Sequence, residues 1–164
     1  MARAWDVPGL RPGAGFRDAA GRVVLTRRRE TMSYREGTLL GEDIEELHAM
    51  RVSSRRLRAA MDAFDSAFPA KSFRPLLRRV KEITDVLGQA RDLDVAVERL
   101  TATLATMGED ERPGLEGLIA RYPHIAALFA RIDDERFEKR LVRYIEKHTG
   151  VAMKRLDPRP PGNG

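Results

Sequence analysis

Residues 42–68 carry the helical periodicity that most constrains how this chain can fold. Apolar side chains recur there at the spacing of one face of an amphipathic helix. They are Met50, Leu57, Met61, Phe64 and Phe68. Acidic residues at 42 and 43 suit the start of such a helix, because negative charge is favoured at a helix N-terminus. The pattern predicts a long helix that packs one face against a core.

The same predicted helix carries a second stripe, which is basic. Its members are His48, Arg51, Arg55 and Arg58. At 100° per residue they lie within roughly 80° of one another, about a quarter-turn from the apolar stripe. Mutual repulsion destabilises such a stripe unless an anion compensates it. We therefore expect it at the rim of a packed interface, where it binds an anionic partner.

The rest of the chain predicts an all-α fold, an antiparallel bundle of about five or six helices. We expect helices over 18–35, 42–68, 72–87, 92–107 and 114–121, followed by one or two that reach residue 148. Ser72 and Asp92 are the expected N-caps of the third and fourth helices, with Gly88 breaking the chain between them.

Both ends of the chain have the composition of loops. Gly and Pro are frequent before residue 17 and after residue 156. We expect a flexible segment over 1–17, in which Trp5 is the one residue able to dock. The predicted domain covers 18–150, and a disordered tail is expected over 151–164.

A second basic stripe lies on the predicted helix 72–87. Its members are Arg74, Arg78 and Lys81, with Lys71 just before the helix as a secondary candidate. Residues 48–92 hold 10 basic and 5 acidic side chains, whereas the segments on either side are balanced, so this stretch carries the whole net charge of +5. A localised excess indicates an anionic partner. The strong preference for arginine over lysine suits bidentate phosphate contacts, although an Arg-rich genome would produce it too.

Several classes of function find no support in the sequence. The chain has no cysteine, and it has no membrane-length apolar run or signal-peptide core, so we expect a cytoplasmic protein. No phosphate-binding glycine loop and no nucleophile beside a base is present. The pair Glu45 and His48 has the spacing of a di-iron ligand pair, but no second such pair exists. We expect no enzyme activity, no cofactor and no metal.

Two segments together resemble the CHAD family, the conserved histidine α-helical domain. The first is the run His48-x-x-Arg51-Val-x-x-Arg55-Arg56-Leu-Arg58, and the second is Leu87-Gly88-x-Ala90-Arg91-Asp92-Leu93-Asp94-Val95. The resemblance covers about residues 20–148. It implies a basic groove that binds inorganic polyphosphate, an association with polyphosphate granules, and frequent occurrence beside a triphosphate-cleaving CYTH domain.

The resemblance also assigns roles to the remaining motif residues. Arg91 joins His48 and the two basic stripes as a polyphosphate contact. Arg56 points about 100° away from the first stripe, so we expect it to bind a carboxylate or a partner chain. Asp92 and Asp94 are expected to be structural, one as a helix cap and one orienting Arg91 or a groove arginine.

Two questions stay open at this point. The family generally has two helical halves, and this sequence resembles one. Either a homodimer completes the architecture, or the sequence is a truncated member. Single-stranded nucleic acid is the alternative polyanion. Readers of single strands usually stack bases on aromatic side chains, and neither basic stripe contains an aromatic residue. Inorganic polyphosphate is therefore the preferred ligand.

Overall fold

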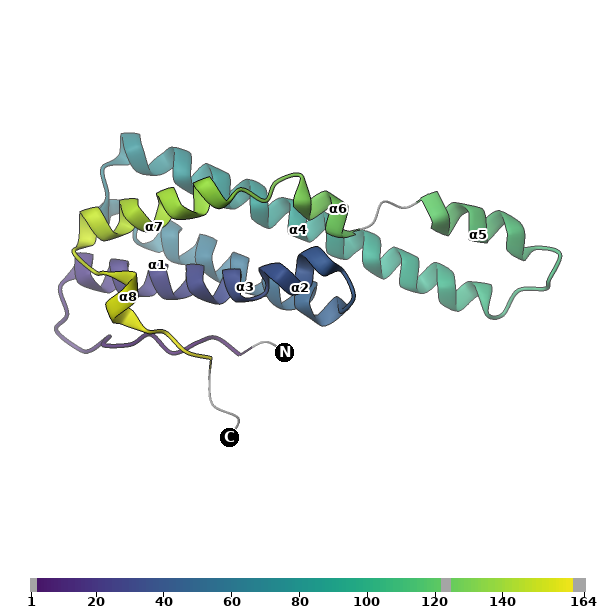
Figure 1. Cartoon of the computed structure of the whole chain (residues 1–164), viewed down its shortest axis with the longest axis horizontal. Helices are drawn as coiled ribbons and strands as arrows, with labels where there is room; N and C mark the ends of the chain where they lie inside the picture. Colours follow the sequence, from purple (N-terminus) through teal and green to yellow (C-terminus); the bar gives the residue numbers. More distant parts are fainter. Residues whose placement is uncertain (1–2, 122–124, 161–164) are drawn as a thin grey trace.

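The computed structural model describes residues 3–121 and 125–160, which form a helical bundle with one projecting hairpin (Figure 1). The helices are α1 (Phe16–Ser33), α2 (Arg35–Leu40), α3 (Ile44–Ala63), a 3-10 turn η1 (Asp65–Ala67), α4 (Ala70–Leu104), α5 (Arg112–Arg121), α6 (Ile125–Ala130), α7 (Glu135–Thr149) and α8 (Met153–Leu156). These described residues contain no strand, which confirms the predicted all-α bundle. None of the helices in this part of the chain is apolar enough over sufficient length to cross a membrane.

The main core lies among α1, α3, α4 and α7, which run side by side in Figure 1. Its largest side chains are fully buried. They include Leu25, Met61, Phe73, Phe137, Leu141 and Ile145. Burying each of them contributes roughly 1.5–3 kcal/mol. A second cluster, built on Leu47, Met50, Leu87 and Phe129, joins α3 and α4 to α6.

Helix α3 begins as predicted but ends early. The Asp43 carboxylate caps its first turn by accepting a hydrogen bond from the Glu45 amide at 2.8 Å. The helix stops at Ala63, and η1 follows before Pro69. Phe64 and Phe68 therefore reach the core from the turn between α3 and α4 and do not extend the α3 stripe.

Helix α4 corrects the prediction of two helices separated at Gly88. It is continuous over 35 residues. One glycine inside a helix costs about 1 kcal/mol, and the burial of Leu87 and Ala90 beside it outweighs that cost. Asp92 lies in the middle of α4 and is not a cap. Pro69, not Ser72, is the N-cap residue of α4.

The segment after α7 corrects the prediction of a disordered tail from residue 151. Val151, Met153 and Leu156 belong to the main core. The Met153 amide donates to the Glu146 carboxylate at 2.8 Å. Gly21 makes room for this segment, because a Cβ there would lie 2.8 Å from Val151 Cγ2 and 2.4 Å from Thr149 Oγ1. Residues 161–164 of the predicted tail lie outside the described part of the chain.

A buried carboxylate ties the N-terminal segment to the bundle. Glu30 is 0% exposed, and its two oxygens accept from Arg27 at 2.5 Å and from Arg56 at 2.8 Å. Arg27 also donates to the carbonyl of Trp5 at 2.8 Å, and Trp5 is buried. The anchor expected within segment 1–17 is thus docked against α1. Arg56 binds a carboxylate, which is the first of its two expected roles.

We predict that Glu30→Gln lowers the free energy of unfolding by about 3 kcal/mol, because two arginines at the core lose their common counter-charge. Urea unfolding followed by circular dichroism measures this change. Glu109→Gln, in the exposed turn before α5, is the matched control and should change stability little. An unaltered unfolding midpoint for Glu30→Gln would contradict the structural role of this cluster.

Candidate anion-binding groove

An open groove follows the seam between α3 and α4. The two helices run antiparallel, since Arg58 on α3 lies 3.6 Å from Asp85 and Asp62 lies 3.4 Å from Lys81. The groove has two sections, of about 490 Å³ and 390 Å³, and Asp62 lines both. The side chains that line it on α4 recur every three or four residues from Ala70 to Asp92. At 1.5 Å per residue this wall is about 33 Å long, so the groove suits a linear ligand.

The first section lies between the middle of α3 and the middle of α4. Arg51, Arg55 and Arg58 line it from α3, as the sequence predicts. On the opposite wall, α4 has no side chain at Gly88. A Cβ at Gly88 would meet nothing within 4 Å, so the missing side chain leaves open space in front of the arginines. Helix α4 passes through this point without a break. We therefore interpret Gly88 as a residue that widens the groove and not as a helix end.

The second section lies toward the turn between α3 and α4. Arg74, Arg78 and Lys81 line it, together with Phe73 and Leu77. The apolar pair is buried in the main core, so this section has an apolar floor and a basic rim. The structure therefore brings the two predicted basic stripes together as parts of one groove.

Four aspartates also line the groove, and most of them were not expected from the sequence. They are Asp62, Asp65, Asp85 and Asp92. Against the six basic side chains they leave an excess of two positive charges. Arg58 lies 3.9 Å from Asp62 and 3.6 Å from Asp85, while Lys81 lies 3.4 Å from Asp62. The signal was present in the sequence, because Asp62 and Asp85 each follow a groove cation by four residues.

Four groove arginines keep their charge uncompensated. In the described part of the chain, Arg51, Arg55, Arg74 and Arg78 have no carboxylate within ion-pair distance. The Nε of Arg51 is buried and lacks a hydrogen-bond partner among the described residues, and so does Nδ1 of His48. Leaving such a group unsatisfied costs about 1–3 kcal/mol. Arg51 also lines the first section, so an anionic ligand there would offset its charge.

His48 is near the groove but does not line it. It precedes Arg51 by one helical turn and is half-buried. His48 therefore extends the α3 stripe by one turn beyond the first section, toward the start of α3.

The structure does not bring Arg91 into the groove. Its guanidinium donates to Asp94 at 3.1 Å, and both side chains are partly buried. Asp94 was one of the two aspartates expected to be structural, and Arg91 is its partner. Asp92 takes a different place, on the groove wall. Lys71 is exposed in the first turn of α4.

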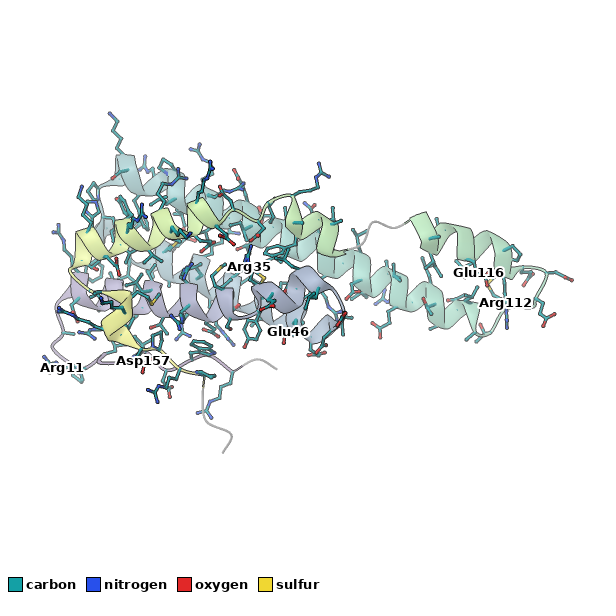
Figure 2. All side chains as sticks on the ribbon, in the orientation of Figure 1. Arg11, Arg35, Glu46, Arg112, Glu116 and Asp157 are labelled. Carbon is teal, nitrogen blue, oxygen red and sulfur yellow. The ribbon has the colours of Figure 1, made fainter. Side chains whose placement is uncertain are left out.

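Arginines elsewhere in the bundle have a different environment. Arg28 binds Glu138 at 3.0 Å, and Arg35, labelled in Figure 2, forms two hydrogen bonds with Asp133. The Asp133 contact raises the pKa of Arg35. Burial raises the pKa of Glu138 above its ordinary value of 4.5, even with Arg28 beside it. These pairs fasten α7 and its preceding loop to α1 and α2, so their charges are used within the fold.

Comparison with known proteins adds one finding to this geometry. The family model described as the CHAD domain matches residues 23–159. No curated protein and no solved structure matches the chain. The family match spans every helix that builds the groove, together with the packed segment after α7. This chain therefore belongs to the CHAD domain family.

Proposed function

We propose that this protein binds inorganic polyphosphate along the α3–α4 groove, without turning it over. The observation that carries the proposal is the row of four arginines without carboxylate partners in one linear groove, Arg51, Arg55, Arg74 and Arg78. Guanidinium groups match phosphoryl oxygens in geometry and charge. Membership in the CHAD family supports the same ligand class, and granules of polyphosphate are the corresponding cellular location.

The groove favours polyphosphate over single-stranded nucleic acid. A reader of single strands offers exposed aromatic faces for base stacking. Phe73 is the aromatic side chain among the groove residues, and it is 1% exposed. Its ring already stacks on Phe68 at a centroid distance of 4.5 Å. Arginines without exposed aromatic neighbours match a chain of closely spaced phosphates better than a chain that carries bases.

The groove chemistry also favours binding over hydrolysis. Thr84 supplies a hydroxyl to the groove lining, but it donates to the Val80 carbonyl at 2.9 Å. Asp62 and Asp85 are engaged by Arg58 and Lys81. We expect no orthophosphate release when the protein is incubated with polyphosphate and Mg²⁺. Release above that of a buffer control would replace binding with catalysis.

We predict that Arg51→Gln combined with Arg55→Gln weakens polyphosphate binding roughly tenfold to a hundredfold, because two charge-assisted contacts are lost. With six contacts the log–log salt slope of the wild type should be about −4, by analogy with single-stranded nucleic acid, and the variant should lose about 1.4 of it. Titration at several salt concentrations, with an oligonucleotide competitor, measures both quantities.

The matched control for that experiment is Lys154→Gln combined with Arg155→Gln, which removes two exposed charges from α8. It should bind nearly as the wild type does. Equal losses in the two variants would show a response to net charge alone, and a flat salt dependence would remove the electrostatic basis of the proposal.

A second prediction concerns the groove carboxylates. Asp62→Asn combined with Asp85→Asn should raise polyphosphate affinity several-fold, because Arg58 and Lys81 lose their internal partners and the positive excess doubles from two to four. Calorimetric titration measures the change, with Glu109→Gln and Asp110→Asn in the exposed turn as the control pair. A weaker binder would instead show that the aspartates hold these cations in their binding geometry.

We also propose that two copies associate through the projecting hairpin of α5 and the end of α4. None of the described residues between 91 and 121 belongs to either core cluster. Leucines on the hairpin remain accessible, with Leu118 45% exposed. Figure 2 shows Arg112 and Glu116 at its far end, away from the bundle. An apolar hairpin without cover is typical of an interface.

Light scattering should accordingly give twice the 18.5 kDa mass of the chain. Leu118→Glu is expected to reduce that mass to one chain. Leu40→Glu, at a leucine of α2 that is 63% exposed, is the control and should leave the mass unchanged. A monomeric wild type, with and without polyphosphate, would contradict the association.

A further inference from the structure

Helix α7 carries a third basic stripe that the groove does not include. Its members are Arg136, Arg140, Arg143 and Lys147, and each of them is exposed. They recur at helical spacing and lie within roughly 60° of one another. The Arg140 guanidinium rests over the Phe137 ring at 5.7 Å, an arrangement that leaves its N–H donors available. We call these four residues the α7 stripe.

The acidic residues of α7 lie on other faces and are already engaged. Glu138 binds Arg28 on α1 at 3.0 Å, and Glu135 lies 3.4 Å from Arg35. Glu146 accepts from the Met153 amide. The carboxylates therefore face α1, α2 and the chain after α7, whereas the four cations of the stripe lie on a neighbouring face. No acidic residue of α7 lies within the stripe to neutralise it.

Arg140 and Lys147 place one edge of the α7 stripe toward α4. Tyr144 marks that side, since its hydroxyl hydrogen-bonds to Ser72 at 2.8 Å and its ring stacks on Phe73. Arg140 and Lys147 are within about 60° of Tyr144 around the helix. Arg79 fixes the other end of the contact by donating to the Ile132 carbonyl at 3.0 Å. Figure 1 shows α7 running beside the first half of α4.

Lys71 lies between the groove and this stripe. Around α4 it falls between Arg74, which lines the groove, and Ser72, which contacts α7. Lys71 is exposed. Positive charge thus continues from the second section of the groove, over the first turn of α4, to the α7 stripe.

We propose that the α7 stripe is a second binding track for polyphosphate, used by chains that are longer than the α3–α4 groove. The inference rests on the proposed function and extends it from ligand class to ligand length. A short chain fills the groove alone. A long chain leaves the groove past Arg74, crosses Lys71 and continues along α7, so the protein prefers long polyphosphate.

The test compares two ligands on two variants of the full chain. The stripe variant carries Arg140→Gln, Arg143→Gln and Lys147→Gln. The control carries Arg29→Gln, Lys154→Gln and Arg155→Gln, three exposed cations on α1 and α8. Titrations use inorganic triphosphate, which is shorter than the groove, and long-chain polyphosphate. Circular dichroism checks that both variants fold.

We expect the stripe variant to bind long-chain polyphosphate roughly tenfold more weakly, with a salt slope reduced by about 2, while its triphosphate affinity stays at the wild-type value. Arg140→Lys with Arg143→Lys should retain long-chain binding because the charges remain. Equal long-chain affinity in wild type and stripe variant, or an equal loss in the control, would overturn the inference alone. A wild type that binds neither ligand would overturn the proposed function and the inference with it.

Discussion

Helix α4 is the element on which both the core and the groove depend. Its buried face supplies Phe73, Leu76, Val80 and Leu87 to the two core clusters. The adjoining face lines the groove from Ala70 to Asp92. Because one uninterrupted helix carries both faces, packing of the core fixes the register of the groove wall. The arginines of α3 then face the same positions along α4 in every folded molecule.

The cationic side chains fall into two groups, those that form ion pairs within the bundle and those that do not. Arg27, Arg28 and Arg56 contact carboxylates of other turns and helices, and these ion pairs hold the N-terminal segment, α1, α3 and α7 together. Four groove arginines and the cations of the α7 stripe have no carboxylate within ion-pair distance among the described residues. The four are Arg51, Arg55, Arg74 and Arg78. A chain with a net charge of only +5 can therefore present basic surfaces, because carboxylates such as Glu30 and Glu138 are used in ion pairs within the bundle.

The groove itself is less positive than its basic residues alone suggest. Asp62 and Asp85 approach Arg58 and Lys81 from across the seam. Such contacts position flexible side chains before a ligand arrives, and a polyanion has to compete with them. A ligand with dense charge compensates more readily for displacing these pairs than one with sparse charge. The groove therefore favours a ligand of high charge density over one of low charge density.

Much of this site could be predicted from helical periodicity. The apolar and basic stripes of α3 follow from it, and Arg51, Arg55 and Arg58 lie where that periodicity puts them. Arg56 binds the Glu30 carboxylate, and its angle on the helix, away from the basic stripe, predicted such a contact. Local signals were misleading at Gly88, because the cost of a glycine in a helix is small beside the burial of its neighbours. Local signals were misleading again after residue 150. The Pro-rich composition there predicted disorder, but three of its side chains belong to the core.

The sequence by itself determined the helical class, the faces of each helix and the segment that holds the excess charge, since these depend on spacing along one chain. Only the tertiary structure decided which faces meet. It placed four aspartates in the groove and set the C-terminal half of α7 beside the start of α4. The position of α7 depends on contacts between distant residues, such as the ion pair of Arg28 with Glu138, which are 110 positions apart. No local pattern contains the arrangement of the helices relative to one another, because the packing of buried side chains selects it.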